Sequence, residues 1–223
     1  MKNYDKEIAL LAMCPHDFSP VDIIGKTGNG KSTFLENFAK RRRTFYKPAF
    51  SDWKKDECIK IFNAREIAKS IIESISNGDP EAWRNLFLAY DVVAIDDFDV
   101  FAGRPSMQEE LFSYFLVCNK AIIVTTASEI RVPVFSDALV SFFSSGAHIH
   151  LEDPDKKSKL DFLQDQLSLQ TFTVTEDALL WLAEQEFISF ASIKGFIKTL
   201  QLFETDSAYT LEDCKRLAKS YIK

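Results

Sequence analysis

The stretch "IIGKTGNGKST", residues 23–33, decides the fold of this chain. Gly25, Gly30, Lys31 and Ser32 match the pattern G-x-x-x-x-G-K-[ST] at every position, with the required four residues between the two glycines. The pattern is that of a phosphate-binding loop. An alternative is a glycine-rich turn that binds nothing, but this alternative does not account for lysine and serine directly after the last glycine.

The context of the loop agrees with the pattern. An apolar segment at 21–24, "VDII", precedes it and is predicted to be a strand, and "KSTFLENFAKRRR" at 31–43 follows it as a predicted amphipathic helix. Glycines allow backbone N–H groups to surround a phosphate, and the start of the helix favours anionic charge. We therefore expect ATP or ADP with Mg²⁺ as ligands, bound by Gly25, Lys26, Thr27, Gly28, Asn29, Gly30, Lys31, Ser32 and Thr33.

Two acidic residues end a second apolar segment, "VVAIDD". Adjacent acids after four apolar residues are costly without a nearby cation, so we assign Asp96, together with Ser32, to the Mg²⁺ site and Asp97 to the polarisation of an attacking water. Thr125 and Thr126 end the following apolar segment, "AIIVTT", and either could contact the γ-phosphate or that water. We take Thr126 as the catalytic candidate, although a threonine is also an ordinary strand residue.

The fold class predicted from this pattern is α/β, a P-loop NTPase with a parallel sheet flanked by helices. Further strands are expected at 58–64, 91–97 and 120–128. Helices are expected at 65–75, 79–90 and 106–119, the last one capped by Ser106 with Glu109. After about residue 152 the pattern becomes helical, with Thr175 and Thr210 at two helix starts. We divide the chain into a nucleotide-binding domain at 1–152 and a small helical lid at 153–223.

Composition excludes several other classes of protein. The net charge of −6 argues against binding nucleic acid mainly through its phosphates. A basic run at Arg41–Arg43 is better explained as a solvated helix end than as a DNA-binding patch. The 4 cysteines form no metal-binding pattern and are expected to be free thiols. The N-terminal apolar run is too short for a signal peptide or a membrane span, so we expect a cytoplasmic protein.

The segment "VVAIDDFDVFAGRPSMQEELFSYF", residues 92–115, resembles the Walker B region of DnaA-related AAA+ ATPases in its double Asp, its Ala-Gly and its Gln-Glu-Glu followed by aromatics. Residues 65–90 resemble the insertion of the same initiators, and 139–163 their arginine-finger segment and its continuation into the lid. The resemblance covers most of 5–203. It implies an AAA+ fold, and the layout of a module without a DNA-binding domain resembles the Hda-like members.

Three departures from the family pattern bear on mechanism. The family's finger arginine falls on Phe142, and its lid arginine falls on Lys194, which we keep as a catalytic candidate beside the alternative of a solvated helix lysine. An acidic residue common in the family falls on Ala127. An arginine finger is worth about 10³ to 10⁵ in rate, so the sequence leaves ATP hydrolysis open and is compatible with a weak ATPase.

The resemblance implies a regulator of bacterial replication initiation that acts through protein contacts. DnaA, a helicase or the sliding clamp are the expected partners, and a homo- or hetero-oligomer is compatible with the family. Direct DNA binding is expected to be weak or absent, because Leu88 stands where initiators often have arginine. The alternatives are an ATPase like the helicase loaders and an adaptor that binds nucleotide without hydrolysing it. Phe142 and Phe143 are candidates for a contact with a partner, with a core position as the alternative.

Overall fold

The computed structural model describes residues 4–45, 58–185, 189–203 and 208–222. Contacts divide the chain into two compact units. The sheet unit comprises Tyr4–Gly25 and Lys31–Leu151, and the helical unit includes Lys26–Gly30 and Glu152–Lys223. Each unit is described by itself below.

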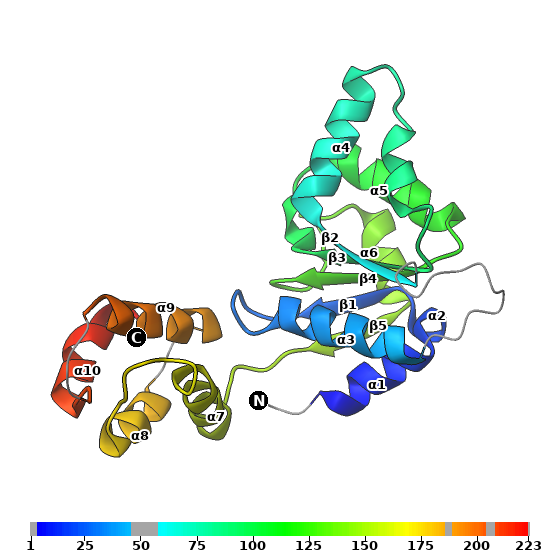
Figure 1. The fold of residues 1–223 in the computed structure, drawn as a ribbon. Helices are drawn as coiled ribbons and strands as arrows, with labels where there is room; N and C mark the ends of the chain where they lie inside the picture. Colours follow the sequence, from blue (N-terminus) through cyan, green and yellow to red (C-terminus); the bar gives the residue numbers. More distant parts are fainter. Residues whose placement is uncertain (1–3, 46–57, 186–188, 204–207, 223) are drawn as a thin grey trace. The chain divides into compact units, whose positions relative to one another are not determined.

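A parallel β-sheet forms the centre of the sheet unit (Figure 1). The strands lie in the order β2-β3-β4-β1-β5. They are β1 (Val21–Ile24), β2 (Ile59–Asn63), β3 (Val92–Asp96), β4 (Ala121–Thr126) and β5 (Ala147–His150). The central strands β3, β4 and β1 are almost entirely buried and mostly apolar because helices cover both faces of the sheet, as expected for parallel strands. This architecture confirms the predicted fold class.

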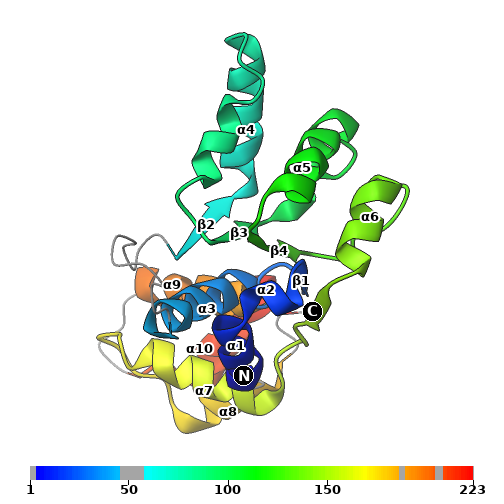
Figure 2. The ribbon, with the colours of Figure 1, turned by 90° about the vertical axis from the view of Figure 1, so that its right-hand side faces the viewer.

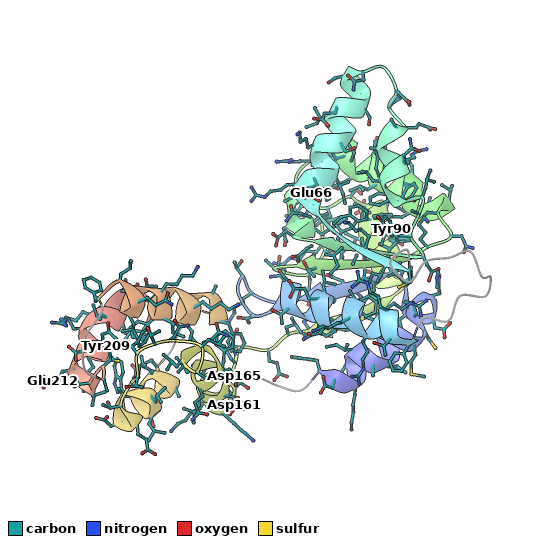
Figure 3. The ribbon with its side chains drawn as sticks, viewed as in Figure 1. Glu66, Tyr90, Asp161, Asp165, Tyr209 and Glu212 are labelled. Carbon is teal, nitrogen blue, oxygen red and sulfur yellow. The ribbon has the colours of Figure 1, made fainter. Side chains whose placement is uncertain are left out.

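Helices pack on both faces of the sheet (Figures 1 and 2). On one face lie α1 (Asp5–Met13) and α3 (Lys31–Phe45), with α2 (Pro15–Phe18) next to α1. On the other face lie α4 (Ala64–Ser76), α5 (Pro105–Val117) and α6 (Asp137–Ser144), with the 3₁₀ helices η2 (Ala82–Phe87) and η3 (Phe98–Phe101). Tyr90, labelled in Figure 3, packs its ring edge-on against Phe62 of β2 on this face. Much of the phenylalanine excess is thereby buried.

One predicted detail of the sheet unit is wrong. Ser106 does not cap α5, because Pro105 takes the first helical position and Arg104 is the capping residue, which places Ser106 inside the helix. The short helix predicted at 79–90 is present over narrower bounds as the 3₁₀ helix η2. Strand β5 was not predicted from the sequence.

The helical unit contains α7 (Lys156–Leu167), α8 (Glu176–Glu184), α9 (Phe190–Leu202), α10 (Leu211–Leu217) and the 3₁₀ helix η4 (Ala218–Ser220). The side chains that form its core include Leu163, Leu182 and Phe196, all fully buried. Thr175 and Thr210 are the capping residues of α8 and α10, as predicted, and Thr210 forms a complete capping box with Asp213. Tyr209, labelled in Figure 3, donates its hydroxyl to the carbonyl of Leu200 at 2.5 Å.

Within the ranges that the structure describes, no helix is both long enough and apolar enough to cross a membrane.

Candidate phosphate-binding site

The loop that joins β1 to α3 has the backbone that its glycines predict. Gly28 has φ +83° and Gly30 has φ +94°, both in the left-handed region that other residues rarely adopt. At the base of the loop, the N–H of Gly25 donates to the carbonyl of Thr126 at 3.0 Å, which joins the loop to the end of β4. Lys31 is buried, and its Nζ donates to the carbonyl oxygen of Gly25 at 2.6 Å. The Lys31 ammonium is therefore held at the base of the loop.

The tip of the loop, Lys26–Gly30, groups with the helical unit. Asn29 donates from Nδ2 to Oδ1 of Asp153 at 2.7 Å, and Lys26 donates to the other oxygen of the same carboxylate. A Cβ added to Gly28 would lie 2.5 Å from the Cβ of Ser189, the capping residue of α9. Any side chain at position 28 would therefore displace the loop or the start of this helix.

Asp96, at the end of β3, joins the loop to the neighbouring strand ends. Its Oδ2 accepts a hydrogen bond from the Ser32 hydroxyl at 2.7 Å, and its Oδ1 accepts one from the Thr125 hydroxyl at 2.5 Å. These oxygens are of the kind that Mg²⁺ prefers, because this ion is usually held by one or two protein carboxylates with phosphate and water. The residues present thus fit a magnesium ion shared with a nucleotide.

No group of three or more His, Cys, Asp or Glu side chains placed to hold a metal ion occurs in the described ranges.

Asp97 directly follows the strand and is exposed. Its backbone is left-handed, with φ 61° and ψ 45°, and it is the one non-glycine residue with positive φ in the part of the chain that the structure describes. Its N–H donates to the Thr125 hydroxyl at 3.0 Å. A left-handed aspartate costs free energy and persists only when its surroundings fix it, a feature that clusters at functional sites.

The structure separates the two threonines at the end of β4, because successive strand residues point to opposite faces of a sheet. Thr125 contacts Asp96, whereas Thr126 is fully buried and donates its hydroxyl to Oδ1 of Asp22 at 2.7 Å. Both threonines are candidates from the sequence and Thr126 is the predicted one, because residue type alone carries no signal that Thr125 faces the acid. The catalytic role of Thr126 stays a prediction.

Lys194, the other catalytic candidate, lies on α9 and is exposed. Its Nζ lies 5.8 Å from the centroid of the Phe162 ring on α7, within the range of a cation–π contact. This position is compatible with both sequence interpretations, a phosphate-binding lysine and a surface lysine.

Phe142 and Phe143, at the position of the family's finger arginine, differ in burial. Phe143 is 1% exposed and belongs to the core, whereas Phe142 is half-buried on α6 and stacks on Phe115 of α5 with ring centroids 5.7 Å apart. Phe142 also contacts Phe112 edge-on at 6.3 Å. The core alternative is confirmed for Phe143, and Phe142 remains partly exposed.

In the basic run at the end of α3, Arg41 is exposed as predicted, whereas Arg42 is not a solvated side chain. Arg42 has an 11% exposed side chain, pairs with Asp91 at 2.9 Å and donates to the carbonyl of Ala12 at 3.1 Å. His16 contacts the other oxygen of Asp91 at 3.0 Å. Arg42 therefore ties α1 and α2 to the sheet.

Comparisons with known proteins agree with this geometry. The family model for the bacterial DnaA ATPase domain matches residues 5–150. The chromosomal replication initiator protein DnaA of Latilactobacillus sakei is 23% identical over 192 residues, which cover 84% of this chain and 41% of that protein. This chain thus spans less than half the length of that relative.

Two solved structures have the same fold. Domain III of the Thermotoga maritima replication initiation protein DnaA matches with a TM-score of 0.81 and 23% identity, covering 100% of this chain and 94% of that one. AMPPCP-bound DnaA from Aquifex aeolicus matches with a TM-score of 0.70 and 20% identity, over 90% of this chain and 61% of that one. The sheet, the loop and the matched family model lead to one conclusion: this chain belongs to the bacterial DnaA ATPase domain family and has the AAA+ fold.

Proposed function

We propose that this chain binds ATP or ADP with Mg²⁺ at residues 25–33 and acts in bacterial replication initiation as a DnaA-related regulator of the Hda-like type. The observation that carries the proposal is the network in which Asp96 accepts hydrogen bonds from Ser32 and Thr125. It brings the loop and the acid of β3 together at the edge of the sheet where open α/β sheets bind ligands. The Aquifex aeolicus relative, solved with AMPPCP, supports an adenine nucleotide.

In this proposal each residue has a separate task. Lys31, whose ammonium has three donors, keeps its bond to Gly25 and donates to the β- and γ-phosphates as well. Ser32 and Asp96 hold Mg²⁺, which neutralises phosphate charge when bound. Asp97 orients an attacking water, and Lys194 is the second catalytic candidate. Residues 1–152 then form the nucleotide-binding domain and 153–223 its lid.

The proposed Mg²⁺ role gives a first prediction. Asp96→Asn keeps the shape and a hydrogen-bond acceptor for Ser32 but removes the negative charge. We expect the gain in ATP affinity on adding Mg²⁺ to fall roughly tenfold or more, since bonds to a charged group contribute about 1.5–3 kcal/mol. Titration of ATP with and without Mg²⁺, for the wild type and this variant, measures the effect. An equal Mg²⁺ dependence in both proteins contradicts the assignment.

Turnover distinguishes an ATPase from an adaptor. ATP hydrolysis by the purified protein is measured alone and with added DnaA, against Lys31→Ala as the inactive reference. Turnover above that reference supports the enzyme. Background turnover under all conditions, with nucleotide still bound, supports the second candidate, the non-hydrolysing adaptor, which Phe142 and Ala127 at the family's polar positions favour.

The partner is proposed to be DnaA or another replication protein, such as a helicase or the sliding clamp, with direct DNA binding weak or absent. Co-purification with each of these proteins distinguishes the Hda-like role from that of a helicase loader. Recovery of the helicase together with single-stranded DNA would favour the loader.

Phe142 tests the contact with a partner. The half-buried ring lies on Phe115, so Phe142→Arg replaces an apolar edge with a charge while leaving the fully buried Phe143 in place. We expect the partner affinity to fall about tenfold or more, because truncation of a central interface aromatic costs about 2 kcal/mol or more. Binding to the identified partner is measured with Leu202→Arg, an exposed residue of the helical unit, as the control. If the Phe142→Arg variant binds the partner with unchanged affinity, Phe142 does not contribute to the interface.

A further inference from the structure

Asp22 is a buried carboxyl group in the middle of β1. It is 1% exposed, lies between Val21 and Ile23 of the apolar core, and occupies the strand next to the phosphate-binding loop. In the parallel sheet it pairs in register with Val124 on β4 and His148 on β5. A carboxylate in such surroundings is costly unless it is paired with a cation or fully hydrogen-bonded.

Only one of the two carboxyl oxygens of Asp22 has a hydrogen-bond partner among the described residues. Oδ1 accepts from the Thr126 hydroxyl at 2.7 Å, while Oδ2 is buried without a partner among the described residues. No lysine or arginine pairs with Asp22 in the part of the chain that the structure covers. The unpartnered oxygen is where a proton would reside, because a neutral carboxylic acid tolerates burial far better than a carboxylate.

The charged and titratable groups around Asp22 come from three neighbouring elements. Asp99 of η3 and Glu129 of the segment after β4 carry charge of the same sign, and His148 of β5 is the register neighbour and is exposed. Burial raises the pKa of Asp22 from 3.8 to about 7, the Thr126 hydrogen bond opposes this rise, and the charges of Asp99 and Glu129 add to it.

Thr126, at the end of β4, is hydrogen-bonded to two residues of the chain segment that leads into the loop. Its carbonyl accepts a hydrogen bond from the N–H of Gly25 at 3.0 Å, and its hydroxyl donates to Asp22, three residues before Gly25 in the chain. If Asp22 were ionised, its negative charge would be buried, and one of its oxygens would have neither a hydrogen-bond partner nor water. Hydration of this charge favours a state in which the ends of β1 and β4 separate, and that separation breaks the hydrogen bond between Gly25 and Thr126.

We propose that Asp22 is a positioning residue whose proton keeps β1 and β4 closed beneath the phosphate-binding loop, so that its ionisation loosens the loop and weakens nucleotide binding. The nucleotide part of this inference rests on the proposed function. Asp22 touches no ligand in this account and acts through Thr126 and Gly25.

Stability gives a readout that needs no nucleotide. Because the folded pKa lies above the unfolded value of 3.8, the stabilisation by neutral Asp22 is fully present below about pH 4 and is lost as the pH rises through about 7. Asp22→Asn is neutral at every pH and has nearly the same shape, so it should lack this loss. Unfolding by denaturant between pH 5 and 8 compares the two proteins.

Hydrogen exchange of the Gly25 amide reports on the contact itself. In the wild type we expect protection of this amide to fall about tenfold between pH 6 and 8, beyond the intrinsic pH effect, and to stay constant in Asp22→Asn. Asp99→Asn removes a like charge that raises the pKa of Asp22, so it should move the midpoint of this change to lower pH. A midpoint that Asp99→Asn raises or leaves unchanged would overturn the proposal.

Nucleotide binding completes the test. With a pKa near 7, the neutral fraction of Asp22 falls about tenfold from pH 6 to 8, and the ADP affinity of the wild type should fall by the same factor relative to Asp22→Asn. The variant corrects for the titration of the nucleotide and of every group other than Asp22. Equal pH dependence of exchange and affinity in both proteins overturns the inference. A pH-dependent Gly25 amide in a protein that binds no nucleotide overturns the proposed function and leaves the closure of β1 on β4 supported.

Discussion

Lys31→Ala should weaken ATP and ADP binding roughly 30- to 150-fold. Lys31 is buried at the base of the loop with its ammonium on the carbonyl of Gly25, so its charge is already placed and little side-chain freedom is lost when a phosphate binds. A charge-assisted hydrogen bond contributes about 2–3 kcal/mol, and each 1.4 kcal/mol is a factor of ten in affinity. Calorimetric titration of the purified proteins measures the loss.

Lys26→Ala is the matched control for this variant. It removes a lysine from the same loop, but Lys26 is 68% exposed and pairs with Asp153. An exposed ion pair contributes about 1 kcal/mol or less, so its removal should change affinity less than about fivefold. Equal losses for the two lysines would mean that the loop acts by its total charge and that Lys31 has no special position.

The second large effect concerns stability. Phe98→Ala should lower the free energy of unfolding by about 3–5 kcal/mol, the usual cost of removing a buried phenylalanine ring. Phe98 is 0% exposed and lies against Phe101, Phe135 and Phe143, with ring centroids between 5.2 and 5.8 Å apart. Denaturant unfolding with linear extrapolation gives the value.

Phe142→Ala supplies the comparison for Phe98, because Phe142 packs on the same cluster but is only half-buried. Its cost should be clearly smaller. Phe98 also follows the left-handed Asp97 directly, so the buried ring anchors the strained residue of the site. If the two variants lose equal stability, the core is not centred on Phe98.

The strands that the sequence predicted best are those buried on both faces of the sheet, because burial on both faces requires a run of mostly apolar residues. Strands β3 and β4 are apolar runs that end in polar residues, β1 is apolar except for Asp22, and the loop pattern identified the helix that follows β1. Strand β5 was not predicted because it is an edge strand of four residues, "AHIH", in which exposed His148 and His150 alternate with partly buried neighbours. Such a short half-polar segment is recognisable only when β1 is placed beside it.

The site was predicted to a similar degree. Asp96 and Ser32 are both assigned to the Mg²⁺ site from the sequence, and the Ser32 hydroxyl lies 2.7 Å from Oδ2 of Asp96. The prediction was possible because Ser32 is part of the loop pattern and Asp96 ends an apolar strand. The roles of Thr125 and Thr126 could not be separated, since identical side chains at adjacent positions differ only in the face to which they point. Asp22 gave no signal, because within "VDII" it is a single acid whose partner is 104 residues away.

Titration of ¹⁵N-labelled protein with ADP and Mg²⁺, followed by amide chemical shifts, tests the central claim most directly. We expect saturable binding, with the largest shifts at the amides of residues 25–33 and a further shift at Asp97, and loss of these shifts in Lys31→Ala. Saturable binding whose largest shifts lie outside the loop, or no binding at millimolar ADP by the folded wild type, would contradict it.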